Sequence, residues 1–151
     1  MRNGRISSCM EFNADVPRVE SAYESMETIH PEAYGALSGA TLEVGNHRSI
    51  AWYEPADNKV VINPDFVDGM SDEEVLGVLL NTGLKILHWD ITEATNRSKN
   101  IAMDLIVNKE VSNITGASVP EDTITSEDVD IDSNLISREN FNQLCEEVAS
   151  E

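Results

Sequence analysis

The most extended pattern of apolar and polar positions in the chain runs from Ser71 to Asn108. Ser71 is a good helix N-cap, and Glu74 three residues later completes a capping box just before an apolar run. The residues that follow repeat at helical spacing on two faces: Val75, Val78, Leu79, Thr82, Ile86 and Trp89 on one, and Leu76, Leu80, Leu84 and Leu87 on the other. Because both faces are largely apolar, the pattern predicts a buried central helix.

A second helical pattern occupies the end of the same stretch. It carries apolar residues at Ile101, Ala102, Leu105 and Ile106. A polar linker precedes it, in which Ser98 is the expected cap, and the helix is expected to end near Ser112. Asp104 lies inside this apolar run, where a carboxylate requires a partner.

Shorter helical patterns flank this central pair. The first begins at Val16 with Pro17 at its first helical position, and it ends at His30 before a proline. A short helical turn is expected over Pro31–Leu37, and a last helix after a cap at Ser137.

Three short segments have the composition of strands and are separated by turn residues. They are Thr41–Val44, Ser49–Glu54 and Lys59–Ile62. Their tight spacing predicts an antiparallel meander packed on the helices. We therefore expect one α+β domain over residues 1–151, with a small, mainly antiparallel three-stranded sheet.

Two segments carry a resemblance to a known family. SDEEVLGVLL at residues 71–80 and NIAMDLIVN at residues 100–108 resemble the metal-dependent peptidase domain often found beside von Willebrand factor A-like domains. The flanking ADNKVVINPDFVDGMSDEE, residues 56–74, resembles the strand, the Asn-Pro-x-Phe turn and the helix start of that family. The resemblance covers residues 34–148 and implies a zincin-like arrangement of the helices. In the family the first helix carries His-Glu-x-x-His, and a segment Asn-x-Ala-x-Asp-x-x-x-Asn follows.

The first of these motifs is altered in this chain. Its positions hold Asn81, Thr82 and Lys85, so that both histidines and the glutamate are missing. A zincin uses two imidazoles one helical turn apart to hold zinc, and the glutamate to take a proton from the metal-bound water. Only Asp104, a further ligand position that the resemblance implies, remains. The sequence therefore predicts a degenerate copy with no catalytic residue, no metal and no cofactor.

The same resemblance brings Lys85 near Asp104. One hypothesis is that Lys85 pairs with Asp104 and supplies the positive charge that zinc would otherwise provide. In the alternative, Lys85 extends to solvent and Asp104 bonds to backbone or Asn groups. His88, near the end of the central helix, is interpreted as a structural histidine or one bonded to a nearby acid, and not as a metal ligand.

A strongly acidic segment spans residues 118–133. It contains Glu121, Asp122, Glu127, Asp128, Asp130 and Asp132, and it has neither a helical nor a strand period. The spacing of an EF-hand is absent, so that a solvated loop is favoured over a calcium site. Its charge makes it a candidate contact for a basic partner.

Composition adds a formal net charge of −18, from 28 acidic and 10 basic residues. Nucleic-acid phosphates repel such a chain, whereas basic proteins attract it, although net charge also simply maintains solubility. Cys9 and Cys145 are not in a metal-binding spacing and are expected to be free thiols. No run of signal-peptide or membrane-spanning type is present, so a cytoplasmic location is expected. Stand-alone copies of the family occur in tailed phages, which extends this expectation to the cytoplasm of an infected bacterium.

These observations favour an inactive metallopeptidase-like protein that acts as a protein-binding or inhibitory module. Three alternatives stay open: an acidic nucleic-acid mimic that inhibits a DNA- or RNA-binding host enzyme, a structural component of a phage particle, and a metal-dependent peptidase with a non-standard site. The last would draw its ligands from His88, Asp90, Glu93 and Asp104. No membrane or direct nucleic-acid partner is expected, and the oligomeric state is left open.

Overall fold

The computed structural model describes residues 17–44, 51–89, 96–114, 116–119 and 128–150. Their elements are α2 (Pro17–Ile29), α3 (Pro31–Ser38), β1 (Thr41–Val44), β2 (Ala51–Glu54), β3 (Lys59–Ile62), α4 (Pro64–Val67), α5 (Asp72–Leu87), α7 (Arg97–Ser112) and α8 (Phe141–Ala149), with short 3-10 turns at Ser133–Leu135 and Arg138–Asn140. The architecture is α+β, as expected. Within the described residues, no helix combines the length and apolar character needed to cross a membrane.

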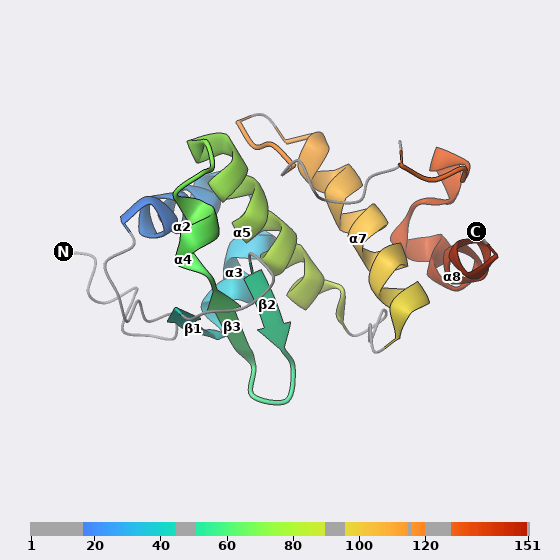
Figure 1. The fold of residues 1–151 in the computed structure, drawn as a ribbon, viewed down its shortest axis with the longest axis horizontal. Helices are drawn as coiled ribbons and strands as arrows, with labels where there is room; N and C mark the ends of the chain where they lie inside the picture. Colours follow the sequence, from blue (N-terminus) through green and yellow to red (C-terminus); the bar gives the residue numbers. More distant parts are fainter. Residues whose placement is uncertain (1–16, 45–50, 90–95, 115, 120–127, 151) are drawn as a thin grey trace.

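The central helix is α5, as the sequence predicts. It packs against α2, α3 and α7, so that it has neighbours on several sides (Figure 1). Its capping box is formed: the Ser71 hydroxyl accepts from the Glu74 amide at 3.2 Å, and the Glu74 carboxylate accepts from the Ser71 amide at 3.0 Å. These two bonds satisfy two of the amides that a helix N-terminus leaves without partners.

The sheet differs from the expected meander. Its order is β1-β3-β2, with β1 parallel to β3 and β2 antiparallel to β3, so the sheet is mixed rather than mainly antiparallel. The physical reason is burial: Val60, Val61 and Ile62 make β3 the most apolar strand, and it takes the central position. The strands β1 and β2 form the two edges, where Thr41 and Glu43 of β1 and Trp52 of β2 are exposed.

The core consists of two clusters that share α7. Leu79, Leu80 and Leu84 of α5 pack in the larger cluster with residues of α2, α3 and the sheet. The opposite side of α7 packs against the C-terminal helix α8 in a smaller cluster: Ala102, Leu105, Ile106, Ile136, Phe141, Leu144 and Val148. The helix α7 therefore lies between α5 and α8 (Figure 1).

Two helix starts differ from the sequence expectation. The N-cap of α7 is Asn96, whose side chain accepts from the Lys99 amide at 2.9 Å, and not Ser98. Asn96 has the same short polar side chain, so that either residue was chemically suitable. Before α8, Ser137 precedes the 3-10 turn Arg138–Asn140 and makes no side-chain capping bond. Its hydroxyl instead accepts from the side-chain amide of Asn140 at 3.0 Å. The first helix does hold Pro17 at its first turn, whereas Val16 lies outside the described residues.

Candidate functional site

The positions that the resemblance aligns with a metal motif lie on the side of α5 that faces α7. Asn81 and Lys85 are one turn apart on α5, and Asp104 and Asn108 are one turn apart on α7. The amide group of Asn81 donates to Asn108 Oδ1 at 2.6 Å, and Lys85 Nζ lies 2.6 Å from Asp104 Oδ1. We call these four residues the polar seam. The seam joins the two helices by one neutral and one charged hydrogen bond.

The ion pair confirms that Lys85 pairs with Asp104. That its charge takes the place of zinc stays a prediction. Both side chains are about three-quarters buried, with exposed fractions of 26% for Lys85 and 28% for Asp104. Asp104 therefore has the partner that its place in an apolar run requires, and Lys85 does not extend freely to solvent. Asn108 is almost fully buried beside the pair.

Thr82 does not contribute to the polar seam. Its side chain is buried, and its hydroxyl donates to the carbonyl of Val78 in the preceding turn of α5 at 2.9 Å. This is a common way for a helical threonine to satisfy its hydroxyl. The Thr82 hydroxyl is therefore engaged within its own helix.

The residues of the polar seam do not fit a hydrolytic zinc site. Such a site needs three ligands of the imidazole, thiolate or carboxylate type and an open position for water. The seam offers a single carboxylate, and the Lys85 ammonium already lies against it. A zinc ion at Asp104 would have to displace this cation or accept its repulsion. Among the described residues, no group of three or more His, Cys, Asp or Glu is arranged to hold a metal ion.

His88 lies in a second polar cluster, where α5 meets α7 and the turn before α8. Its Nε2 lies 3.0 Å from Glu110 Oε1, and its Nδ1 lies 3.0 Å from Arg138 Nη1. Because a guanidinium can only donate, Nδ1 acts as an acceptor, and Nε2 carries the proton that is donated to Glu110. We therefore assign the neutral Nε2–H tautomer. The interpretation of His88 as a histidine bonded to a nearby acid is confirmed.

A cavity of about 280 Å³ adjoins His88, lined in part by Lys109, Arg138 and Glu139. Its cationic groups are engaged within the protein: Lys109 Nζ donates to the carbonyls of Ser133 and Ile136 at 2.7 and 3.3 Å, and Arg138 binds His88. These contacts fasten the C-terminal part of the chain to α5 and α7. Glu110 and Arg138 are not predicted from the sequence. They lie 22 and 50 positions after His88 in the chain, and no local pattern links them to it.

The acidic segment is described only in part. Glu121, Asp122 and Glu127 lie outside the described residues, whereas Asp128, Asp130 and Asp132 are exposed. The Asp132 carboxylate accepts from the backbone amide of Asn134 at 2.9 Å and caps the following 3-10 turn. Of the non-standard ligand set, Asp90 and Glu93 also lie outside the described residues. The other two, His88 and Asp104, are bonded in the two separate clusters above.

Cys145 is a free cysteine on α8, and burial raises the pKa of its thiol. Cys9 lies outside the described residues. A raised pKa leaves less thiolate at neutral pH, so the Cys145 environment does not favour nucleophilic chemistry.

The chain was compared with protein families, curated proteins and solved structures. No family model, no curated protein and no solved structure matches this chain.

Proposed function

We propose that this protein is a non-catalytic protein-binding module built on a metallopeptidase-like scaffold, consistent with an inhibitory or host-interaction role in a phage-infected bacterial cell. The observation that supports it best is the ion pair between Lys85 and Asp104. In the resembled family this region holds zinc, and here a side-chain ammonium binds the one carboxylate that is left. Asn81 bonds to Asn108, and Thr82 bonds to the carbonyl of Val78. Neither position therefore supplies a metal ligand or a general base.

A protein partner is favoured over nucleic acid by charge. The chain carries 28 acidic and 10 basic residues, a net −18, which repels phosphate backbones and attracts basic protein surfaces. Protein binding also requires only a folded surface, and not the ligands and the base of a hydrolytic zinc site.

The proposal is tested by isolating the partner and rebuilding the complex. A tagged copy of the protein is used to capture partners from its native cells, and the best candidate is purified separately. We expect the two purified proteins to form a complex of fixed stoichiometry in EDTA, measured by size-exclusion chromatography with light scattering. We also expect the partner to remain intact after long incubation with zinc. Metal-dependent cleavage of the partner, or the absence of any stoichiometric complex, contradicts the proposal.

The acidic charge favours a more specific second candidate, a mimic of nucleic acid that occupies the basic groove of a DNA- or RNA-binding enzyme. Such binding weakens as salt rises, because exposed charges are screened. Competing DNA would also displace this protein from the groove. An affinity that neither salt nor DNA changes rules out mimicry while leaving the protein-binding proposal intact.

A further inference from the structure

The outer face of the sheet is defined by the strand register. Glu43, Val61 and Trp52 form one row across β1, β3 and β2, and Thr41, Lys59 and Glu54 form the next. Successive side chains of a strand point to opposite faces, so that these six residues share one face. Leu42, Val60 and Ile62 occupy the other face and are buried in the larger core cluster.

Trp52 is the prominent apolar group of this outer face. Its exposed fraction is 43%, and among the described residues the only other large hydrophobic residue exposed to this degree is Ile29. A tryptophan on a polar sheet face costs solvation free energy, because its apolar ring remains in contact with water. Exposed aromatic residues are also enriched at protein interfaces.

Two glutamates share this face with the tryptophan. Lys59 Nζ lies 3.4 Å from Glu43 Oε2 and 3.8 Å from Glu54 Oε2, and these two glutamate side chains are 49% and 37% exposed. The charge of Glu43, followed by that of Glu54, raises the pKa of Lys59, and Asp57 in the adjoining turn adds to this effect. The face therefore attracts cations, because in the described part of the chain the one positive charge of Lys59 lies beside the three acids Glu43, Glu54 and Asp57.

Building on the protein-binding function proposed above, we propose that this outer sheet face binds an arginine-bearing segment of a basic protein partner. A guanidinium is planar, stacks on an indole ring and pairs with a carboxylate at the same time. Trp52 supplies the ring, and Glu43 and Glu54 supply the carboxylates. The Glu43 and Glu54 side chains are 49% and 37% exposed, so that an incoming arginine can reach their carboxylates beside the less exposed Lys59, at 24%.

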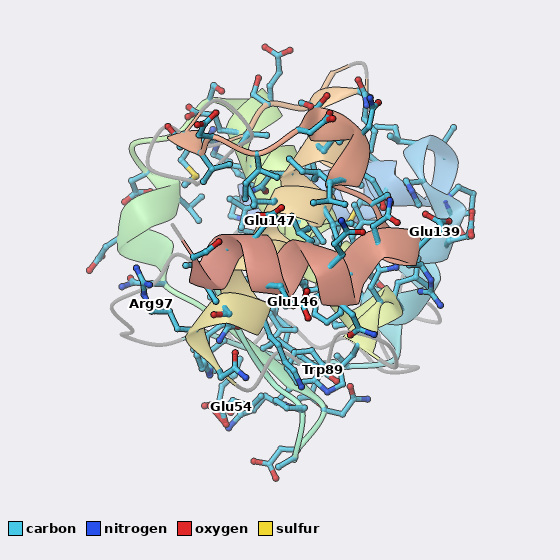
Figure 2. The ribbon with its side chains drawn as sticks, turned by 90° about the vertical axis from the view of Figure 1, so that its right-hand side faces the viewer. Glu54, Trp89, Arg97, Glu139, Glu146 and Glu147 are labelled. Carbon is cyan, nitrogen blue, oxygen red and sulfur yellow. The ribbon has the colours of Figure 1, made fainter. Side chains whose placement is uncertain are left out.

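The probe is a fluorescently labelled peptide of nine arginines, compared with peptides of nine lysines and of alternating glycine and serine. Binding to the purified full chain is measured by fluorescence anisotropy. Two double variants have the same change in net charge: Glu43→Gln with Glu54→Gln on the sheet, and Glu146→Gln with Glu147→Gln on α8. Figure 2 shows Glu146 and Glu147 on α8 and Glu54 in a different part of the molecule. The Glu43 and Glu54 side chains are 49% and 37% exposed, and Glu146 and Glu147 are also exposed, so that the substitutions leave the core intact. Circular dichroism checks that each variant is folded.

We expect the arginine peptide to bind more tightly than the lysine peptide, and the glycine-serine peptide not to bind. Trp52→Ala and the sheet double variant should each weaken arginine-peptide binding roughly three- to tenfold. Trp52→Phe should retain part of the arginine-peptide affinity that Trp52→Ala loses. The α8 double variant should lower the affinity at least threefold less than the sheet double variant. Equal losses for the two double variants, or equal binding of arginine and lysine peptides, overturn the proposal.

The same variants separate this inference from the proposed function. If the isolated protein partner binds the sheet variants as tightly as the unaltered chain, the sheet face is not the contact, yet the protein-binding function stands. If no stoichiometric partner exists, the proposed function fails whatever the peptides do. Tighter binding to anionic vesicles or DNA than to the arginine peptide also overturns the assignment of a protein partner.

Discussion

Lys85 Nζ lies 2.6 Å from Asp104 Oδ1, and this contact joins the central helix α5 to α7. The two side chains are about three-quarters buried, so that the pair lies between a surface salt bridge and a fully buried one. The bond between Asn81 and Asn108 joins the same two helices one turn away.

Removing either charge of this pair should destabilise the fold. We expect Lys85→Met or Asp104→Asn to lower the free energy of unfolding by about 1–2 kcal/mol, less than the 3–5 kcal/mol of a fully buried pair because both groups are partly solvated. Urea unfolding of the two single variants and the double variant gives the coupling energy. Additive single-variant effects, with a coupling near zero, would show that the pair contributes nothing.

The His88 cluster should control how firmly the C-terminal part is attached. His88→Ala removes the group that bridges Glu110 and Arg138, and leaves two charged side chains without that partner. We expect faster hydrogen exchange in Arg138–Asn140 and α8, with little change in α2. His88→Gln keeps hydrogen-bonding atoms at the end of the side chain and is the milder control. Equal protection of α8 in the unaltered chain and in His88→Ala contradicts this role.

Gly77 should tolerate no side chain. A Cβ atom at this position would lie 1.9 Å from the carbonyl oxygen of Ser118, which is backbone and therefore cannot turn aside. The same segment is held by the Ser118 amide, which donates to the Glu73 carbonyl at 3.0 Å. We expect Gly77→Ala to destabilise the protein by about 2–4 kcal/mol, as for other overpacked sites, measured by thermal and urea unfolding.

Gly35 is the matched control for that substitution. It lies in α3, and a Cβ built there has no atom within 4 Å. Because alanine has the higher helix propensity, we expect Gly35→Ala to be neutral or to stabilise by about 0.5–1 kcal/mol. A similar loss of stability in both variants would mean that backbone propensity, and not the contact with Ser118, decides the effect.

The ion pairs of Lys59 should be visible in its titration. Glu43 and Glu54 raise the pKa of Lys59 above its ordinary 10.5. A group whose pKa is raised on folding stabilises the fold fully below its unfolded value, and this contribution is lost as the pH rises through the folded value. We expect Glu43→Gln with Glu54→Gln to lower the titration midpoint of Lys59, measured by carbon NMR of the Lys59 Cε. An unchanged midpoint contradicts the pairing.

Local chemistry made much of the fold predictable. The capping box of Ser71 and Glu74 and the apolar faces of α5 are contained in a short stretch of sequence, and both are confirmed. The strand bounds follow from composition and turn residues, and β1 and β3 match the expected segments. The pairing of Lys85 with Asp104 was one of two open hypotheses, and the structure decides for it.

The contacts that were missed depend on distant parts of the chain. The parallel pairing of β1 with β3 arises because the most apolar strand takes the sheet centre, which periodicity within one strand does not reveal. His88 meets Glu110 and Arg138 only because α7 and the C-terminal turn pack against the end of α5. Ser98 and Asn96 are both suitable caps by residue type, and in the structure the cap of α7 is Asn96.

Calorimetric titration of zinc into the metal-free protein tests the central claim most directly, with a peptidase assay on the same samples. A variant that combines Asn81→His, Thr82→Glu and Lys85→His is the positive control, because it restores two imidazoles one turn apart and frees Asp104. We predict that the unaltered chain takes up no stoichiometric zinc and cleaves no peptide, whereas the variant binds zinc. Stoichiometric zinc in the unaltered chain, with peptide cleavage that a chelator abolishes and added metal restores, would contradict the account.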